Sequence, residues 1–256
     1  MSTLGQRLRA LSRLDLRLAS RRLAKLGARH AELSSISSID DSSARPTASL
    51  LRLALAAAAA APHQELPLLS RRDAPELVFQ WPGEHYRLLA ALVETLEPRS
   101  VVEIGTLTGY SALAMLPQLD AGARLTTFDV VAYDRTPGCL LESRDFADGR
   151  LSQQIADLGV AAEAERYTDL LRAADLIFID AAKDGSLEDR LLSHFAAIGL
   201  SDVTLLMFDD IKVWNMMAFW RDLALPKLDL TGLGHWSGTG LVEWRQPEGV
   251  SRAERE

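Results

Sequence analysis

The sequence has little cysteine and no excess of basic charge. Cys139 is the one cysteine in 256 residues, so no disulfide forms within the chain, which is typical of a reducing compartment. With 28 Lys and Arg against 35 Asp and Glu, the formal net charge is -7, which disfavours binding to nucleic acid. We therefore expect a cytoplasmic protein without a nucleic-acid partner.

Long hydrophobic runs and two nucleotide-binding motifs are also missing. The most apolar stretch, SLLRLALAAAAAAP at residues 49–62, is short and contains Arg52. We expect it to form a helix packed on the protein, and we expect no membrane span. Neither G-x-G-x-x-G nor G-K-[ST] occurs, which argues against a nicotinamide oxidoreductase and against a P-loop.

The first 30 residues are rich in Arg and Leu and poor in acids. Leucines recur there at helical spacing, with Arg between them: Leu4, Leu8, Leu11, Leu14 or Leu18, and Leu23. The pattern fits an amphipathic helix that docks on a partner subunit, an organelle transit peptide, or a helix on a membrane surface. We favour the docking helix, and with it a homodimer or a higher homo-oligomer.

The chain divides into a helical extension and a larger α/β domain. Residues 1–75 contain two helical stretches with polar and Pro-containing connections, and we expect them to dock, to mediate oligomerisation or to cover a binding site. Within residues 76–256, apolar strand-like runs alternate with helical segments. This alternation predicts a parallel sheet with helices on both faces, in which ligands bind at the carboxyl ends of the strands.

The stretch VVEIGTLTGYSALAM, residues 101–115, contains a strand, a turn bracketed by Gly105 and Gly109, and a helix. Gly105 lets the backbone approach a ligand closely, and Gly109 relieves crowding where the helix begins. Glu103 precedes the turn, where its carboxylate would repel a pyrophosphate and attract a cationic ligand.

Two further acids are expected near the ends of the next two strands. Asp129 ends the second strand, where a carboxylate can accept hydrogen bonds from a ribose diol. Asp157 would lie near the end of the third strand, within reach of an adenine amino group. Each alone is explained as a turn or cap residue, but together with the glycine turn they favour a nucleoside ligand.

These residues resemble the class I S-adenosylmethionine (SAM)-dependent methyltransferases, especially the catechol and caffeoyl-coenzyme A O-methyltransferase group. The resemblance covers residues 81–244 and rests on the glycine turn and on IFIDAAKDG, residues 177–185. It implies an α/β, Rossmann-like, doubly wound and mostly parallel sheet of seven strands with an antiparallel C-terminal strand, plus N-terminal helices. It also implies a SAM site, with Glu103, Gly105, Tyr110 and Ser111 around the methionine half, Asp129 at the ribose, Asp157 at the adenine, and Thr106, Gly109 and Asp180 beside them.

Two apolar strand-like runs end on acids, one at Asp180 and one at Asp209 and Asp210. If these strands are neighbours, three carboxylates meet at one edge of the sheet, which is unfavourable without a cation. Carboxylate oxygens are suitable ligands for Mg²⁺, which we expect here, or for Mn²⁺ or Ca²⁺ in its place. In the resembled group the equivalents of Asp180 and Asp209 bind a metal together with an Asn, which is Asp210 here. Alternatively, Asp210 caps the next helix, Asp180 is a turn residue, and Lys183 forms a surface salt bridge.

The sequence thus predicts metal-assisted O-methylation of a small molecule with two adjacent oxygens. The metal and Asp180 would activate the acceptor, and Lys183 would take its remaining proton, with a pKa lowered by the nearby cation. His235 is the rival base. The residues expected around the acceptor are Trp81, Trp214, His235 and Trp236. Two alternatives stay open: a metal-independent methyltransferase that uses His235, and a non-catalytic SAM-binding protein.

Overall fold

The structure, a computed structural model, describes residues 44–71, 85–234 and 236–247. All of them belong to one compact unit, Ser43–Glu256. The expected docking helix in the first 30 residues and the expected domain boundary at residues 75 and 76 lie outside the described residues. Both stay predictions, as does the oligomeric state.

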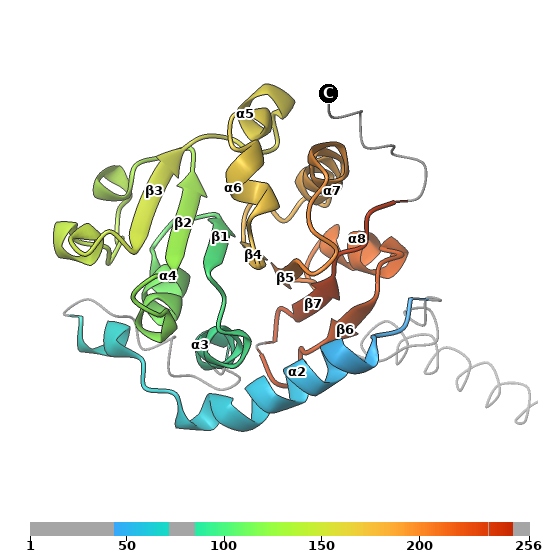
Figure 1. The fold of residues 1–256 in the computed structure, drawn as a ribbon, viewed down its shortest axis with the longest axis horizontal. Helices are drawn as coiled ribbons and strands as arrows, with labels where there is room; N and C mark the ends of the chain where they lie inside the picture. Colours follow the sequence, from blue (N-terminus) through green and yellow to red (C-terminus); the bar gives the residue numbers. More distant parts are fainter. Residues whose placement is uncertain (1–43, 72–84, 235, 248–256) are drawn as a thin grey trace, which may run out of the picture. The chain divides into compact units, whose positions relative to one another are not determined.

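Within the described residues, one seven-stranded sheet has the order β3-β2-β1-β4-β5-β7-β6 (Figure 1). Neighbouring strands among β1 to β5 are parallel, whereas β7 runs antiparallel to both β5 and β6. The strands are β1 (Ser100–Ile104), β2 (Arg124–Asp129), β3 (Leu151–Ile155), β4 (Leu176–Ile179), β5 (Leu205–Asp209), β6 (Lys227–Asp229) and β7 (Thr239–Glu243). The predicted sheet, including its antiparallel C-terminal end, is confirmed.

Helices cover both faces of the sheet (Figure 1). One face carries α2 (Ala48–Ala60), α3 (His85–Leu96) and α4 (Tyr110–Met115), and the other carries α5 (Ala161–Glu165), α6 (Thr168–Arg172), α7 (Ser186–Ile198) and α8 (Met216–Asp222). Short 3₁₀ helices form η1 (Ala61–His63), η2 (Pro67–Ser70), η4 (Leu116–Gln118), η5 (Tyr133–Arg135) and η6 (Ser143–Phe146). The last two give local order to the predicted irregular insertion after β2.

The apolar run of β4 is uninterrupted because both of its faces are buried. Leu176 and Phe178 belong to the core beneath α2, α3 and α4, whereas Ile177 and Ile179 belong to the core beneath α5 to α8. Since successive side chains of a strand point to opposite faces, a central strand needs apolar residues at every position. The first polar residue after the run therefore marks the edge of the sheet.

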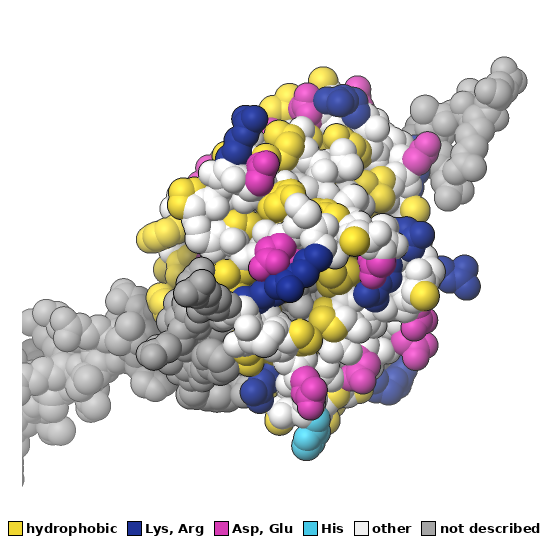
Figure 2. Space-filling model, turned by 90° about the vertical axis from the view of Figure 1, so that its left-hand side faces the viewer, with side chains coloured by type: hydrophobic (Ala, Val, Ile, Leu, Met, Phe, Trp, Pro, Cys, Tyr) yellow, Lys and Arg dark blue, Asp and Glu magenta, His cyan; other side chains and the backbone are white. Residues whose placement is uncertain are grey.

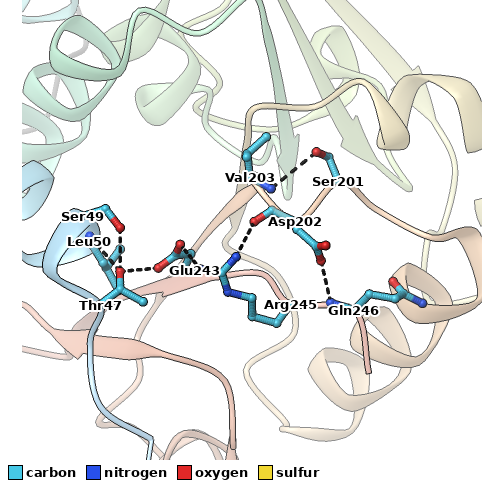
Figure 3. Close-up of polar contacts among 9 residues, drawn as sticks. All are labelled: Thr47, Ser49, Leu50, Ser201, Asp202, Val203, Glu243, Arg245 and Gln246. Carbon is cyan, nitrogen blue, oxygen red and sulfur yellow. Dashed lines mark hydrogen bonds and ion pairs between the residues drawn. The ribbon is translucent and has the colours of Figure 1, made fainter. Parts of the chain in front are cut away.

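Helix α2 is fixed to the sheet by polar contacts at its first turn (Figure 3). Thr47 caps the helix by accepting a hydrogen bond from the amide of Leu50 at 3.1 Å, and its hydroxyl donates to Glu243 of β7. Arg245 pairs with Glu243 and also donates to the carbonyl of Asp202 at 3.3 Å. The alanine-rich helix thus packs on the protein, as its sequence predicts.

The described surface is mixed in charge where it can be seen in Figure 2. Acidic and basic side chains are interspersed on that face, which is the left-hand side of Figure 1. Among the described residues, the helices lack the length and hydropathy that crossing a bilayer requires.

Strand register places the candidate residues at one edge. Ile104 of β1 is paired with Phe128 of β2 and with Ile179 of β4, and Ile179 is paired with Phe208 of β5. The carboxyl ends of β2, β1, β4 and β5 are therefore level, and the residues that follow these positions meet at the same edge of the sheet: Gly105, Asp129, Asp180 and Asp209.

Candidate active site

The glycine turn after β1 is shaped by its neighbours in the fold. Gly105 has φ +107° and donates its amide to the carbonyl of Phe128 at 2.8 Å. A Cβ at this position would lie 1.9 Å from the carbonyl oxygen of Asp180, so only glycine fits. Gly109 has φ +74° at the start of α4, and a Cβ there would lie 2.5 Å from Cγ of Leu141. The contact that requires Gly105 is thus made with the end of β4, within the protein.

Glu103 is a buried acid on β1. The hydroxyl of Ser111 donates to its Oε1, whereas Oε2 is buried and has no hydrogen-bond partner among the described residues. Burial raises the pKa of Glu103 to about 8, although hydrogen bonds from Ser111 and Thr127 favour the charged form. The carboxyl group is therefore largely neutral at pH 7.

Glu103→Gln tests this assignment through the pH dependence of stability. Because the pKa of Glu103 is about 8 in the folded chain and near 4.5 when unfolded, ionisation lowers native stability progressively between those pH values. We expect the free energies of unfolding of the variant and the wild type to be equal near pH 4.5. At pH 8.5 we expect that of the variant to be higher by roughly 4 kcal/mol. Urea unfolding across this pH range measures the difference. Parallel pH profiles for the two proteins would contradict the assignment.

Asp129 at the end of β2 is held in a fixed orientation. Its Oδ2 accepts a hydrogen bond from the amide of Leu107 at 2.9 Å, and its Oδ1 accepts one from the amide of Val131 at 3.0 Å. Thr106 beside it is buried, with its hydroxyl 2.6 Å from that of Thr127. The carboxylate of Asp129 is thus preorganised at the sheet edge, and the side chain of Thr106 is bonded within the protein.

The remaining expected cofactor residues lie around this edge. Asp157 is exposed after β3 and accepts a hydrogen bond from the amide of Gly159 at 2.8 Å. Tyr110 begins α4, and its ring packs edge-on against that of Tyr86 at a centroid distance of 6.1 Å.

Three carboxylates gather where β4 and β5 end. Oxygen atoms of Asp180, Asp209 and Asp210 all lie within 4.8 Å of one another. Lys183 is only 7% exposed, and its Nζ lies 2.6 Å from Asp180, 3.2 Å from Asp210 and 3.6 Å from Asp209. Helix α8 has Asn215 as its N-cap, so Asp210 does not cap it. The predicted adjacency of the acids is confirmed, and Lys183 is not a surface residue.

The electrostatics of this cluster follow from burial and mutual repulsion. Burial and the neighbouring Asp209 raise the pKa of Asp180 to about 6, and Lys183 opposes this shift. Burial alone would lower the pKa of Lys183, but the three carboxylates raise it above its usual range. The lowered pKa that the sequence predicts for Lys183 applies to a site with a bound cation, and it stays a prediction.

Two residues at the start of α3 also reach this region. His85 is buried, with Nδ1 3.8 Å from Oδ1 of Asp209 and 3.4 Å from the hydroxyl of Thr239. Burial, followed by the charges of Asp180 and Asp209, raises the pKa of Tyr86 above its usual range. His85 is not among the predicted site residues, although its helical spacing from Leu88, Leu89 and Leu92 places it on the buried face of α3.

The expected acceptor residues are partly described. Trp214 and Trp236 are 75% and 73% exposed, and they lie on two loops joined by a hydrogen bond from the amide of Lys212 to the carbonyl of Ser237 at 2.8 Å. Trp81 and His235 lie outside the described residues.

A groove of about 540 Å³ is lined by residues of α7, of α8 and of the turns before them, including Asp184, Gly185, Asn215 and Phe219. None of the three clustered carboxylates lines it, although Asp184 and Gly185 belong to the turn that follows β4.

Comparison with known families gives a match over more than half of the chain. A family model described as O-methyltransferase matches residues 72–218. The matched region contains the glycine turn, the three clustered carboxylates and Lys183.

Solved structures of methyltransferases also show similarity to this chain. An O-methyltransferase from Bacillus cereus, in complex with S-adenosylhomocysteine (SAH), is 21% identical, with a TM-score of 0.47, and the match covers 78% of this chain and 92% of that one. The O-methyltransferase TomG from Streptomyces achromogenes, involved in tomaymycin synthesis and in complex with SAM, is 18% identical, with a TM-score of 0.45 and coverage of 72% and 87%. A methyltransferase from Geobacter sulfurreducens is 17% identical, with a TM-score of 0.45 and coverage of 61% and 76%.

Proposed function

The chain belongs to the O-methyltransferase family and is a SAM-dependent enzyme, and we propose that a divalent metal assists it in methylating one of two adjacent oxygens of a small molecule. The observation that carries this proposal is the gathering of three carboxylates at the ends of β4 and β5. It lies at the carboxyl edge of the sheet, level with the glycine turn.

The chemistry of the three acids fits a hard divalent cation such as Mg²⁺ or Mn²⁺. Carboxylate oxygens are the ligands that these ions prefer, and Asp180, Asp209 and Asp210 offer one oxygen each within a small region. The side chain of Asp180 is 33% exposed, which leaves the cluster open on one side. When bound, the metal would lower the pKa of the acceptor oxygens that it contacts.

The SAM site is supported by the residues at the ends of β1 and β2. We assign the ribose to Asp129, because its carboxylate is fixed by two backbone amides and remains partly exposed. We assign the cationic methionine half to Glu103 and Ser111, since the buried Oε2 of Glu103 has no described partner and a nearby positive charge favours the ionised carboxylate. Asp157 is assigned to the adenine.

We assign to Lys183 the role of accepting the proton from the acceptor hydroxyl. We assign to the exposed tryptophans the role of contacting the acceptor. While Lys183 faces three carboxylates it stays charged, so it can accept a proton only when that contact is lost. Trp214 and Trp236 present aromatic surface close to the end of β5, which suits a planar acceptor.

A turnover assay with a panel of acceptors tests the proposal. Methylation is measured for catechol-type compounds with adjacent hydroxyls and for their mono-O-methyl ethers. Each compound is assayed without EDTA, with EDTA, and with EDTA followed by excess Mg²⁺. We expect SAM-dependent methylation of the diols only, lost with EDTA and restored by Mg²⁺. Activity that persists in EDTA would overturn the metal role and would make His235→Ala the next variant to measure.

A further inference from the structure

We propose that Lys183 and the divalent cation compete for the same three carboxylates, so that binding of the cation displaces the Lys183 ammonium from the cluster. This inference rests on the proposed metal role and deepens it. Lys183 thereby gains a second function: its ammonium occupies the metal ligands when the metal is absent, and so it lowers the affinity for the metal.

The geometry of Lys183 supports the competition. Its Nζ contacts Asp180, Asp210 and Asp209 at 2.6, 3.2 and 3.6 Å, and these are the acids whose oxygens form the candidate ligand set. The ammonium is buried among them and is not one partner in an exposed pair. Because like charges repel strongly at such distances, a divalent cation bound to this ligand set would push the Lys183 ammonium away from it.

The charge of the cluster explains why competition is expected in this chain. Three carboxylates and one ammonium leave a surplus of negative charge that still attracts a divalent cation. Asp210 stands where the resembled group has a neutral Asn, and its carboxylate contacts Lys183. Asp210 is therefore a third acid held by Lys183, and all three candidate metal ligands are shared between the ammonium and the divalent cation.

The turn that carries Lys183 is tied to the start of α7, so the proposed movement belongs to the lysine side chain. Lys183 has φ +57° and Gly185 has φ +75°, and they belong to a short turn between β4 and α7. A non-glycine residue in the left-handed region is held there by its surroundings, which here include the contacts of the ammonium. Asp184 beside it accepts hydrogen bonds from the amides of Ser186 and Leu187, each at 2.9 Å, so the start of α7 stays fixed and the side chain of Lys183 is the part that moves.

The test is Mn²⁺ affinity, measured by calorimetry on SAH-saturated protein. We expect Lys183→Met to bind Mn²⁺ at least about tenfold more tightly than the wild type, which is about 1.4 kcal/mol. Lys212→Met is the matched control, because it removes a neighbouring positive charge that pairs with Asp229 at 2.7 Å and does not contact the cluster. Lys183→Arg keeps a cation in the cluster. Both controls are expected to stay within about threefold of the wild type.

The outcomes separate the two proposals. Equal Mn²⁺ affinity in the wild type and Lys183→Met would overturn the competition and leave the metal role intact. A failure of both proteins to bind Mn²⁺, with SAH binding retained, would overturn both.

A measurement on the wild type covers the case in which Lys183→Met does not fold. With lysine labelled at the ε-carbon by ¹³C, Mg²⁺ is titrated and the resonance lost in Lys183→Arg is followed. We expect this resonance to shift in proportion to Mg²⁺ binding. A resonance that stays unchanged at saturation would show that Lys183 keeps its contacts, and would overturn the proposal.

Discussion

Asp180→Asn is expected to lower kcat/KM by about a thousandfold and to abolish Mn²⁺ binding. The substitution removes one charged oxygen ligand from the three-carboxylate cluster, and loss of metal assistance corresponds to several kcal/mol of transition-state stabilisation, roughly three factors of ten. Turnover is measured on the best diol from the acceptor panel, and binding by calorimetry.

The fold of this variant is expected to survive. Burial raises the pKa of Asp180, so a neutral amide is tolerated there at least as well as the carboxylate. Asp189→Asn is the matched control, since Asp189 is exposed in the first turn of α7 and is not one of the clustered acids. Wild-type turnover in Asp180→Asn, in a folded protein, would show that the cluster does not serve the reaction.

Gly105→Ala is expected to destabilise the protein by more than about 4 kcal/mol and to abolish SAH binding. The added Cβ would lie 1.9 Å from the carbonyl oxygen of Asp180, which directly follows β4 and is held by a hydrogen bond from its amide to the carbonyl of Ile104 at 2.9 Å, so it cannot move away cheaply. The φ of +107° adds strain for any residue with a side chain. Urea unfolding gives the stability, and calorimetry gives the affinity for SAH.

Gly122→Ala provides the control for this prediction. A Cβ at Gly122 meets no atom within 4 Å, so we expect a change within about 0.5 kcal/mol. If Gly105→Ala were as mild as Gly122→Ala, the close approach of β1 and β4 at this edge would be incorrect.

The fold and the acids of the site follow from local patterns in the sequence. Runs such as LIFI and LLMF predict central strands because both faces of such strands are buried, and the acid after each run marks the edge of the sheet. The prediction that Asp180 and Asp209 are adjacent assumed that β4 and β5 are neighbouring strands. The parallel pairing of these strands confirms the assumption.

Features that depend on tertiary neighbours were not predictable. Gly105 is predicted to let the backbone approach a ligand, but the space that a Cβ would need there is filled by the carbonyl of Asp180, 75 positions along the chain. The raised pKa of Lys183 depends on three acids at the ends of two different strands, and the sequence does not specify that all three face its ammonium. His85 reaches Asp209 only through the packing of α3 on the sheet, which its helical spacing alone does not specify.

Calorimetric titration of Mn²⁺ into SAH-saturated protein tests the central claim most directly. We expect one Mn²⁺ site per chain in the wild type and none in Asp180→Asn, with SAH still bound by both proteins. A wild-type protein that binds SAH but gives no heat with Mn²⁺ would contradict it, and would leave a methyltransferase whose three clustered acids have another role.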